Sequence, residues 1–241
     1  MLDNPIITLL LAPLLLIQGL LTRLVTPKLP EPKGDRKGVS GIGKPLRLLI
    51  LGDSAAAGVG VARQQDALSG QIVEKLAPYA SIEWRLEAET GSKTADIIER
   101  LDKLHAFQVD VVVVSLGVND VTSNVKIDTW LNLQEQLRSL LVTKFKASVI
   151  LLSSVPPMEM FPALPQPLRW YLGRKSKAFN IALSAQVEKF TELQFLNTHF
   201  PNVDGYIAKD GFHPSGLAYG LWSDQLVEEI KRATPDINYL T

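Results

Sequence analysis

The chain has 241 residues, of which 46% are hydrophobic and 21% are charged, so it can form one α/β domain with a sizeable core and a short appendage. This composition excludes disordered, collagen-like and repeat-array proteins. The chain has no cysteine, which excludes disulfides, thiolate metal ligands and a cysteine nucleophile. Its 25 basic and 25 acidic side chains cancel, which argues against nucleic acid as a partner.

The charges are unevenly placed along the chain. Residues 23–47 carry seven basic and two acidic side chains, a net charge of +5, whereas residues 48–241 carry a net charge of −4. Asp3 adds one further negative charge ahead of them. A basic neck therefore joins an acidic body.

The N-terminal segment is apolar and uncharged. Nineteen residues separate Asp3 from Arg23, and as a helix they would be roughly 28 Å long, close to the thickness of the hydrocarbon core of a bilayer. The start MLDNP has no basic residue, and no small-residue cleavage pattern follows, which argues against a signal peptide. We expect residues 1–25 to form a hydrophobic, transmembrane helix that anchors the protein. A helix packed on the domain is the alternative.

Positive charge follows this helix, and positively charged flanks tend to stay in the cytoplasm. We therefore expect the body of a membrane-anchored protein to lie in the cytoplasm, with the periplasmic or another extracytoplasmic face as the alternative. Residues 26–44 are rich in proline, glycine and charge, which predicts a linker without a core of its own. Residues 45–235 form the expected domain.

The body alternates predicted strands and helices. Apolar or alternating runs predict strands at 46–52, 81–90, 109–117, 147–155 and 193–198. Helical spacing predicts helices near 66–77, 94–105, 128–143, 166–190 and 215–233. This order indicates a mostly parallel sheet covered by helices on both faces, with its ligand site at the carboxyl ends of the strands.

Polar residues gather at those strand ends. Ser54 follows the first strand, Gly91 the second and Asn119 the third, whereas Asp210 and His213 lie between the last strand and the final helix. Since parallel strands all end at one edge of the sheet, these five residues are expected to meet there.

This set suits acyl transfer. The Ser54 hydroxyl becomes a nucleophile when a base such as neutral His213 accepts its proton, and Asp210 orients the imidazole. The backbone N–H groups of Ser54 and Gly91 and the side-chain amide of Asn119 are suitable donors to the oxyanion of a tetrahedral intermediate. Each residue alone also fits a structural role, Ser54 as a helix cap and Gly91 as a turn residue. Their joint occurrence favours the catalytic interpretation.

The sequence resembles the SGNH/GDSL hydrolase family over about residues 46 to 232. The matching blocks are GDSAAAG, the glycine of ETGSKTAD, GVND and DGFHPS, in the family's order. The resemblance implies a flavodoxin-like three-layer α/β/α fold and a serine esterase or lipase without metal or organic cofactor. It also implies the same roles for Ser54, His213, Asp210, Gly91 and Asn119. Ala55 departs from the leucine of the family's motif, which leaves the nucleophile intact.

The expected function is therefore hydrolysis of carboxylic esters by residues 45–235, acting on a small-molecule or lipid ester. Lysophospholipase-like or thioesterase-like action on membrane acyl substrates and O-deacetylation of cell-envelope glycans are alternatives, as is a non-catalytic flavodoxin-like ligand-binding module. Three separated histidines argue against a zinc site. Residues 156–173, rich in Pro, Met and aromatics, fit either an acyl-binding wall or a packing loop. The oligomeric state is left open.

Overall fold

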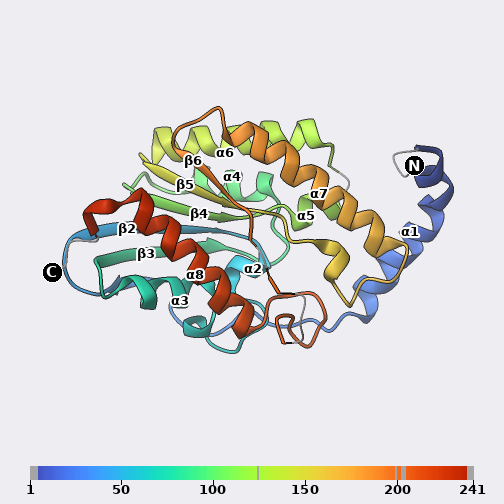
Figure 1. Ribbon diagram of the computed structural model, residues 1–241, viewed down its shortest axis with the longest axis horizontal. Coiled ribbons are helices and arrows are strands. Elements are labelled where there is room, and N and C mark those ends of the chain that lie inside the picture. Colours follow the sequence, from blue (N-terminus) through green and yellow to red (C-terminus); the bar gives the residue numbers. More distant parts are fainter. Residues whose placement is uncertain (1–4, 124, 199, 202–204, 238–241) are drawn as a thin grey trace.

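The computed structural model describes residues 5–123, 125–198, 200–201 and 205–237, which form a sheet with helices on both sides and a long helix apart from them (Figure 1). The strands are β1 (Lys37–Ser40), β2 (Pro45–Gly52), β3 (Ser81–Ala88), β4 (Val111–Ser115), β5 (Val149–Ser153) and β6 (Leu193–Leu196). The helices are α1 (Pro5–Val25), α2 (Ser54–Ala57), α3 (Leu68–Leu76), α4 (Thr94–Lys103), α5 (Val118–Thr122), α6 (Ile127–Lys144), α7 (Leu168–Val187) and α8 (Gly216–Ala233). Short 3-10 helices lie at Gln64–Asp66, Met158–Met160 and Pro235–Ile237.

The strands of the sheet run in the order β1-β3-β2-β4-β5-β6. Strands β2 to β6 are parallel to their neighbours, and only β1 is antiparallel, pairing with β3 at the edge. Without β1, the order is that of flavodoxin-like folds, in which the chain moves outward in both directions from its first parallel strand. The reversal lies between β2 and β4, where such folds place their ligand.

Two apolar clusters fill the space between the sheet and its helices. Alternate residues of β2 point to opposite faces, so Leu48 and Ile50 pack with α3 and α8 while Leu49 and Leu51 pack with α4, α6 and α7. All four side chains are buried. A strand buried on both faces reads as a continuous apolar run, which is why its position is evident in the sequence.

The expected three-layer α/β/α class with a mostly parallel sheet is confirmed, and each predicted strand and helix of the body is present. The second predicted strand, 81–90, ends earlier, at Ala88. Thr90 and Gly91 consequently lie in the loop after β3 rather than in the strand.

The neck is more ordered than expected. Residues 37–40, inside the segment predicted to be a linker, form β1 and pair with Ile82–Arg85 of β3. Lys33 forms a further bridge with Arg63. The sequence of β1, KGVS, is only four residues long and shows no regular alternation of apolar and polar side chains, so it does not predict a strand.

The N-terminal apolar segment is a single helix, α1, which contains Pro13. Its residues Thr8–Val25 are long and apolar enough to cross a membrane, with a mean hydropathy of 1.8. Figure 1 shows α1 running past the beginning of α7, apart from the layers of the sheet.

Candidate active site

The loop after β2 presents Ser54 at the carboxyl edge of the sheet. Ser54 is the first residue of the one-turn helix α2, and Asp53 is its cap, accepting a hydrogen bond from the Ala55 N–H at 3.1 Å. The interpretation of Ser54 as the cap is therefore wrong, because its neighbour has that role. The Ser54 hydroxyl is instead available to a residue distant in sequence.

That residue is His213, in the loop before α8. Its Nε2 atom lies 2.9 Å from Ser54 Oγ, and its Nδ1 atom lies 2.5 Å from Asp210 Oδ2. The second oxygen of Asp210 accepts hydrogen bonds from the backbone N–H groups of Phe212 and His213, each at 3.0 Å. One hydrogen-bonded chain thus connects the serine, the histidine and the aspartate.

The environment of Asp210 keeps it charged. Burial on its own raises the pKa of this carboxyl, but the hydrogen bonds from the His213 ring and from two backbone N–H groups hold the pKa below its usual range. The Asp210 side chain has no exposed surface, whereas that of His213 is 17% exposed. An ionised, buried carboxylate fixes the imidazole with Nδ1 as the donor, so Nε2 can accept a proton.

Asn119, in the first turn of α5 after β4, and Gly91, in the loop after β3, lie close by. The Asn119 side-chain amide donates to Asp53 Oδ2 at 3.3 Å and to the Ser92 carbonyl at 3.0 Å. Gly91 has a φ of +88°, and a side chain there would meet no atom within 4 Å, so the backbone conformation rather than space requires glycine. The structure therefore brings all five predicted site residues to one edge of the sheet.

Glu31, in the neck, holds the Gly91 loop from outside. One carboxylate oxygen accepts hydrogen bonds from the Thr90 N–H at 2.8 Å and the Thr90 hydroxyl at 2.7 Å. The other accepts from Arg36 at 3.0 Å, and Arg36 also donates to the Ala88 carbonyl. No sequence pattern marks a lone glutamate in a proline-rich segment, so Glu31 was not predicted.

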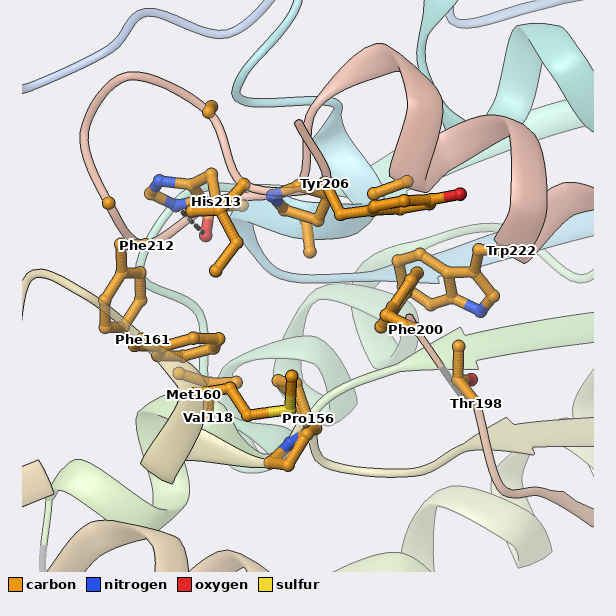
Figure 2. Close-up of a pocket in the computed structure, with 18 of the residues that line it drawn as sticks. Val118, Pro156, Met160, Phe161, Thr198, Phe200, Tyr206, Phe212, His213 and Trp222 are labelled. Atoms are coloured by element: carbon orange, nitrogen blue, oxygen red, sulfur yellow. Dashed lines mark hydrogen bonds between the residues drawn. The ribbon is translucent and has the colours of Figure 1, made fainter. Parts of the chain in front are cut away.

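A pocket of about 450 Å³ opens beside Ser54 and His213 (Figure 2). Figure 2 shows Phe161, Phe212 and Met160 on the side of His213, and Phe200 and Trp222 across the pocket. Pro156, Pro157 and Pro162 also line it, so the part of the segment 156–173 that precedes α7 forms a wall of the pocket. The lining is mainly aromatic and aliphatic, which suits an apolar ligand.

Within the described part of the chain, no group of three histidine, aspartate or glutamate residues is placed to hold a metal ion. Asp120 instead has a structural contact, accepting hydrogen bonds from the Thr94 N–H and hydroxyl at the start of α4. These bonds fix α4 against α5, which carries Asn119.

Comparison with known proteins identifies the family. Residues 50–221 match the GDSL-like Lipase/Acylhydrolase family, and the chain belongs to it. A GDSL-like esterase of Mycobacterium tuberculosis is 26% identical over 199 residues, which are 78% of this chain and 62% of the relative. The chain thus spans less than two thirds of that relative. The family resemblance that the sequence predicted is thereby confirmed.

Solved structures confirm the fold. A carbohydrate esterase family 2 enzyme with its carbohydrate binding domain from Corynascus thermopiles (Myceliophthora fergusii) is similar at a TM-score of 0.64, 14% identity, and coverage of 87% of this chain and 69% of that one. A lipase/acylhydrolase from Enterococcus faecalis has a TM-score of 0.56 and 21% identity, and the match covers 78% of this chain and 96% of that one. The carbohydrate acetylesterase Est24 from Sinorhizobium meliloti has a TM-score of 0.57 and 18% identity, and the match covers 78% of this chain and 99% of that one.

The buried carboxyl of Asp53 generates a prediction about pH. Burial and the nearby Asp120 raise the pKa of Asp53 to about 7, against 3.8 for a free aspartate. Between these values the folded protein binds the proton more tightly than the unfolded chain does. The penalty for burying Asp53 is therefore absent below about pH 4, grows as the pH rises, and is complete above about pH 7.

Asp53→Asn stays neutral at every pH, so we expect the free energy of unfolding to fall less steeply between pH 5 and 7 in the variant than in the wild type. Urea denaturation at a series of pH values measures both slopes. The loss of one hydrogen bond shifts the variant's curve as a whole and does not change its slope. If the free energy of unfolding falls equally steeply with pH in both proteins, the buried Asp53 carboxyl does not cause the loss of stability.

Proposed function

We propose that the protein hydrolyses carboxylic esters with Ser54 as nucleophile, His213 as general base and Asp210 as the group that orients His213. The observation that supports this proposal is the chain of hydrogen bonds from Ser54 Oγ to His213 Nε2 and from Nδ1 to Asp210, at 2.9 and 2.5 Å. Such a chain activates a hydroxyl that is otherwise a weak nucleophile.

In the first half of the reaction, Ser54 Oγ attacks the ester carbonyl carbon while its proton passes to His213 Nε2. Asp210 stabilises the imidazolium that results. When the tetrahedral intermediate collapses, the bond to the alcohol breaks, and His213 donates the proton to the departing oxygen. In the second half, water attacks the acyl carbon and gives a proton to His213. When this intermediate collapses, the bond to Ser54 Oγ breaks, His213 returns the proton to Ser54 Oγ, and the carboxylic acid leaves.

The negative oxygen of each tetrahedral intermediate receives hydrogen bonds from the backbone N–H groups of Ser54 and Gly91 and from Asn119 Nδ2. The amide of Asn119 gives up its longer contact, the 3.3 Å bond to Asp53, to make this interaction. Loss of one such donor typically costs about 2.7–4 kcal/mol in the transition state.

The pocket favours an acyl group longer than acetyl. Its volume of about 450 Å³ and its lining by Met160, Phe161, Phe200 and Trp222 provide apolar contact along a chain of several carbons. This observation supports esterase or lysophospholipase-like action more than the removal of acetyl groups from glycans. A thioester of the same acyl group fits the same pocket.

We also propose that the protein is attached to a membrane through α1 and the basic neck, with the catalytic body on the cytoplasmic side. The support is the apolar character of Thr8–Val25 and the net charge of +5 over residues 23–47. Basic residues near an anionic membrane surface each add about 1 kcal/mol of attraction.

Replacement of the nucleophile tests the mechanism. We expect Ser54→Ala to reduce hydrolysis of p-nitrophenyl butyrate by at least about a thousandfold, because the variant retains only the oxyanion donors and substrate binding. A fluorophosphonate probe should label the wild type and not the variant. Unchanged thermal unfolding serves as the control for folding. A folded wild type that neither reacts with the probe nor turns over ester would favour the non-catalytic ligand-binding module.

A series of acyl chain lengths tests the pocket. Each methylene that the pocket buries contributes about 0.8 kcal/mol, so kcat/KM is expected to rise about fourfold per methylene until the pocket is filled. Met160→Ala should flatten this rise and leave turnover of the acetyl ester unchanged. The exposed neighbouring variant Glu159→Ala should behave as the wild type. A maximum at acetyl would instead support a deacetylase.

The neck residue Glu31 is expected to position Gly91. Burial raises the pKa of Glu31, but its hydrogen bonds from Thr90 and the charge of Arg36 bring the pKa below its usual range, so it acts as an ionised acceptor. Glu31→Ala frees the Thr90 N–H, and we expect kcat to fall about tenfold with KM little changed, since small misplacements of oxyanion donors are costly.

Glu31→Gln keeps an oxygen in place of the one that Thr90 contacts and should restore most of kcat. Asp35→Ala, which removes a neighbouring acid of the same neck, is the matched control and should leave kcat unchanged. An increase of KM alone in Glu31→Ala would show that Glu31 affects substrate binding and not the oxyanion.

A further inference from the structure

The two sides of α1 have an unusual distribution of polarity. Its uncharged polar side chains Thr8, Gln18 and Thr22 lie on one partly covered stripe, whereas the charged Arg23 in its last turn is exposed. The covered stripe comprises Thr8, Leu11, Ala12, Leu15, Gln18, Gly19 and Thr22. The large apolar side chains elsewhere are between 43% and 80% exposed, namely Leu9, Leu10, Leu14, Leu16, Ile17, Leu20, Leu21, Leu24 and Val25. A water-soluble helix has the reverse arrangement, so the outer surface of α1 suits hydrocarbon.

Gln18 ties α1 to the body of the protein. Its side-chain amide donates to the Gln166 carbonyl at 2.7 Å, and its side-chain oxygen accepts from the Leu168 N–H at 3.0 Å. Leu168 is the first residue of α7, whose N–H has no acceptor within its own helix. Leu15 is buried in the same apolar cluster as Leu168. These contacts fix one face of α1 and would be unnecessary for a free transmembrane tether.

The segment that Gln18 contacts continues into the wall of the pocket. The Arg169 side chain donates to the Leu164 carbonyl at 2.6 Å and to the Pro162 carbonyl at 2.9 Å. The Phe161 ring, which lines the pocket, lies 4.7 Å from the Phe212 ring, measured between centroids. Phe212 precedes His213. A continuous set of packed residues therefore connects α1 with the proposed general base.

This attachment also limits how α1 meets a membrane. Gln18 lies seven residues before the end of α1 at Val25, about 10 Å along the helix axis. If α1 crossed the bilayer upright, the irregular backbone at 165–167 and the charged Arg169 would be drawn that far into hydrocarbon. Unsatisfied backbone groups and charges are costly there. A helix lying along the membrane surface avoids this cost, because its exposed leucines face the hydrocarbon while the body of the protein stays in water.

We infer that α1 lies along the surface of an anionic bilayer while it stays docked on the body through Gln18. In this position α1 holds the wall of the pocket against the lipid. The substrates are therefore esters dissolved in the membrane. This inference rests on the proposed hydrolase function for its second part. The basic segment 23–47, with a net charge of +5, begins at Arg23 in the last turn of α1 and complements anionic headgroups.

Gln18→Leu in the full-length protein tests the attachment, because it removes both hydrogen bonds and makes the helix more apolar. Two substrates with one leaving group are compared: water-soluble p-nitrophenyl butyrate, and p-nitrophenyl palmitate dissolved in vesicles of phosphatidylglycerol and phosphatidylcholine. We expect the variant to bind vesicles and hydrolyse the butyrate as the wild type does. Its turnover of the palmitate should fall about fivefold, the effect of about one net hydrogen bond.

Thr22→Leu is the matched control, since it replaces another polar residue of the covered stripe and leaves the Gln18 contacts in place. Equal palmitate turnover in Gln18→Leu and the wild type would overturn the inference. Absence of butyrate turnover in the wild type would refute the proposed hydrolase function instead, and the position of α1 would then be decided by labelling.

The chain has no cysteine, so a single introduced cysteine carries a fluorophore at one known place. We expect lipids with a quencher near the headgroup to quench labels at Leu10→Cys on α1 and at Pro165→Cys on the docked segment. A label at Lys103→Cys, at the end of α4, should not be quenched. Quenching at residue 10 without quenching at residue 165 would show that α1 leaves the body to cross the membrane, and would overturn the inference.

Discussion

The arrangement of the whole molecule depends on one constraint, the reversal of strand order between β2 and β4. Because the connections from these two adjacent strands leave toward opposite sides of the sheet, the long helices α3 and α6 that follow them diverge from the point where both strands end. Ser54 follows β2 and Asn119 follows β4 at this point, and the two long loops before α7 and α8 are free to enclose it. The pocket is the space between those loops. A sheet with strands in sequential order would have offered no such opening.

Much of this arrangement was predictable from the sequence because its causes are local. Leu48 to Leu51 form a run that only a strand buried on both faces requires, and the four valines at 111–114 disfavour a helix. The positions of Ser54, Gly91 and Asn119 followed from the rule that parallel strands end at one edge. His213 and Asp210 followed from their spacing and from the chemistry that they share with a serine. These inferences needed no knowledge of how distant segments pack.

The features that were not predicted all depend on distant contacts. Glu31 and Thr90 are 59 residues apart, and Gln18 and Leu168 are 150 apart. No periodicity connects a glutamate or glutamine with a backbone N–H so far along the chain. The pocket likewise takes Phe161, Phe200 and Trp222 from three different segments. Aromatic residues in loops are visible in the sequence, but which of them face one cavity is decided only by tertiary structure.

The ties that Glu31 and Gln18 make have a practical meaning for anyone who prepares a shortened protein. A fragment that begins at residue 45, where composition alone suggests a domain boundary, would lack β1 and leave the edge of β3 unpaired. It would also lose the acceptor for Thr90 and the partner of the Leu168 N–H. Such a fragment lacks three sets of native contacts, namely those of β1, Glu31 and Gln18, so it does not represent the isolated catalytic unit. Solubilising the protein in detergent micelles preserves contacts that truncation removes.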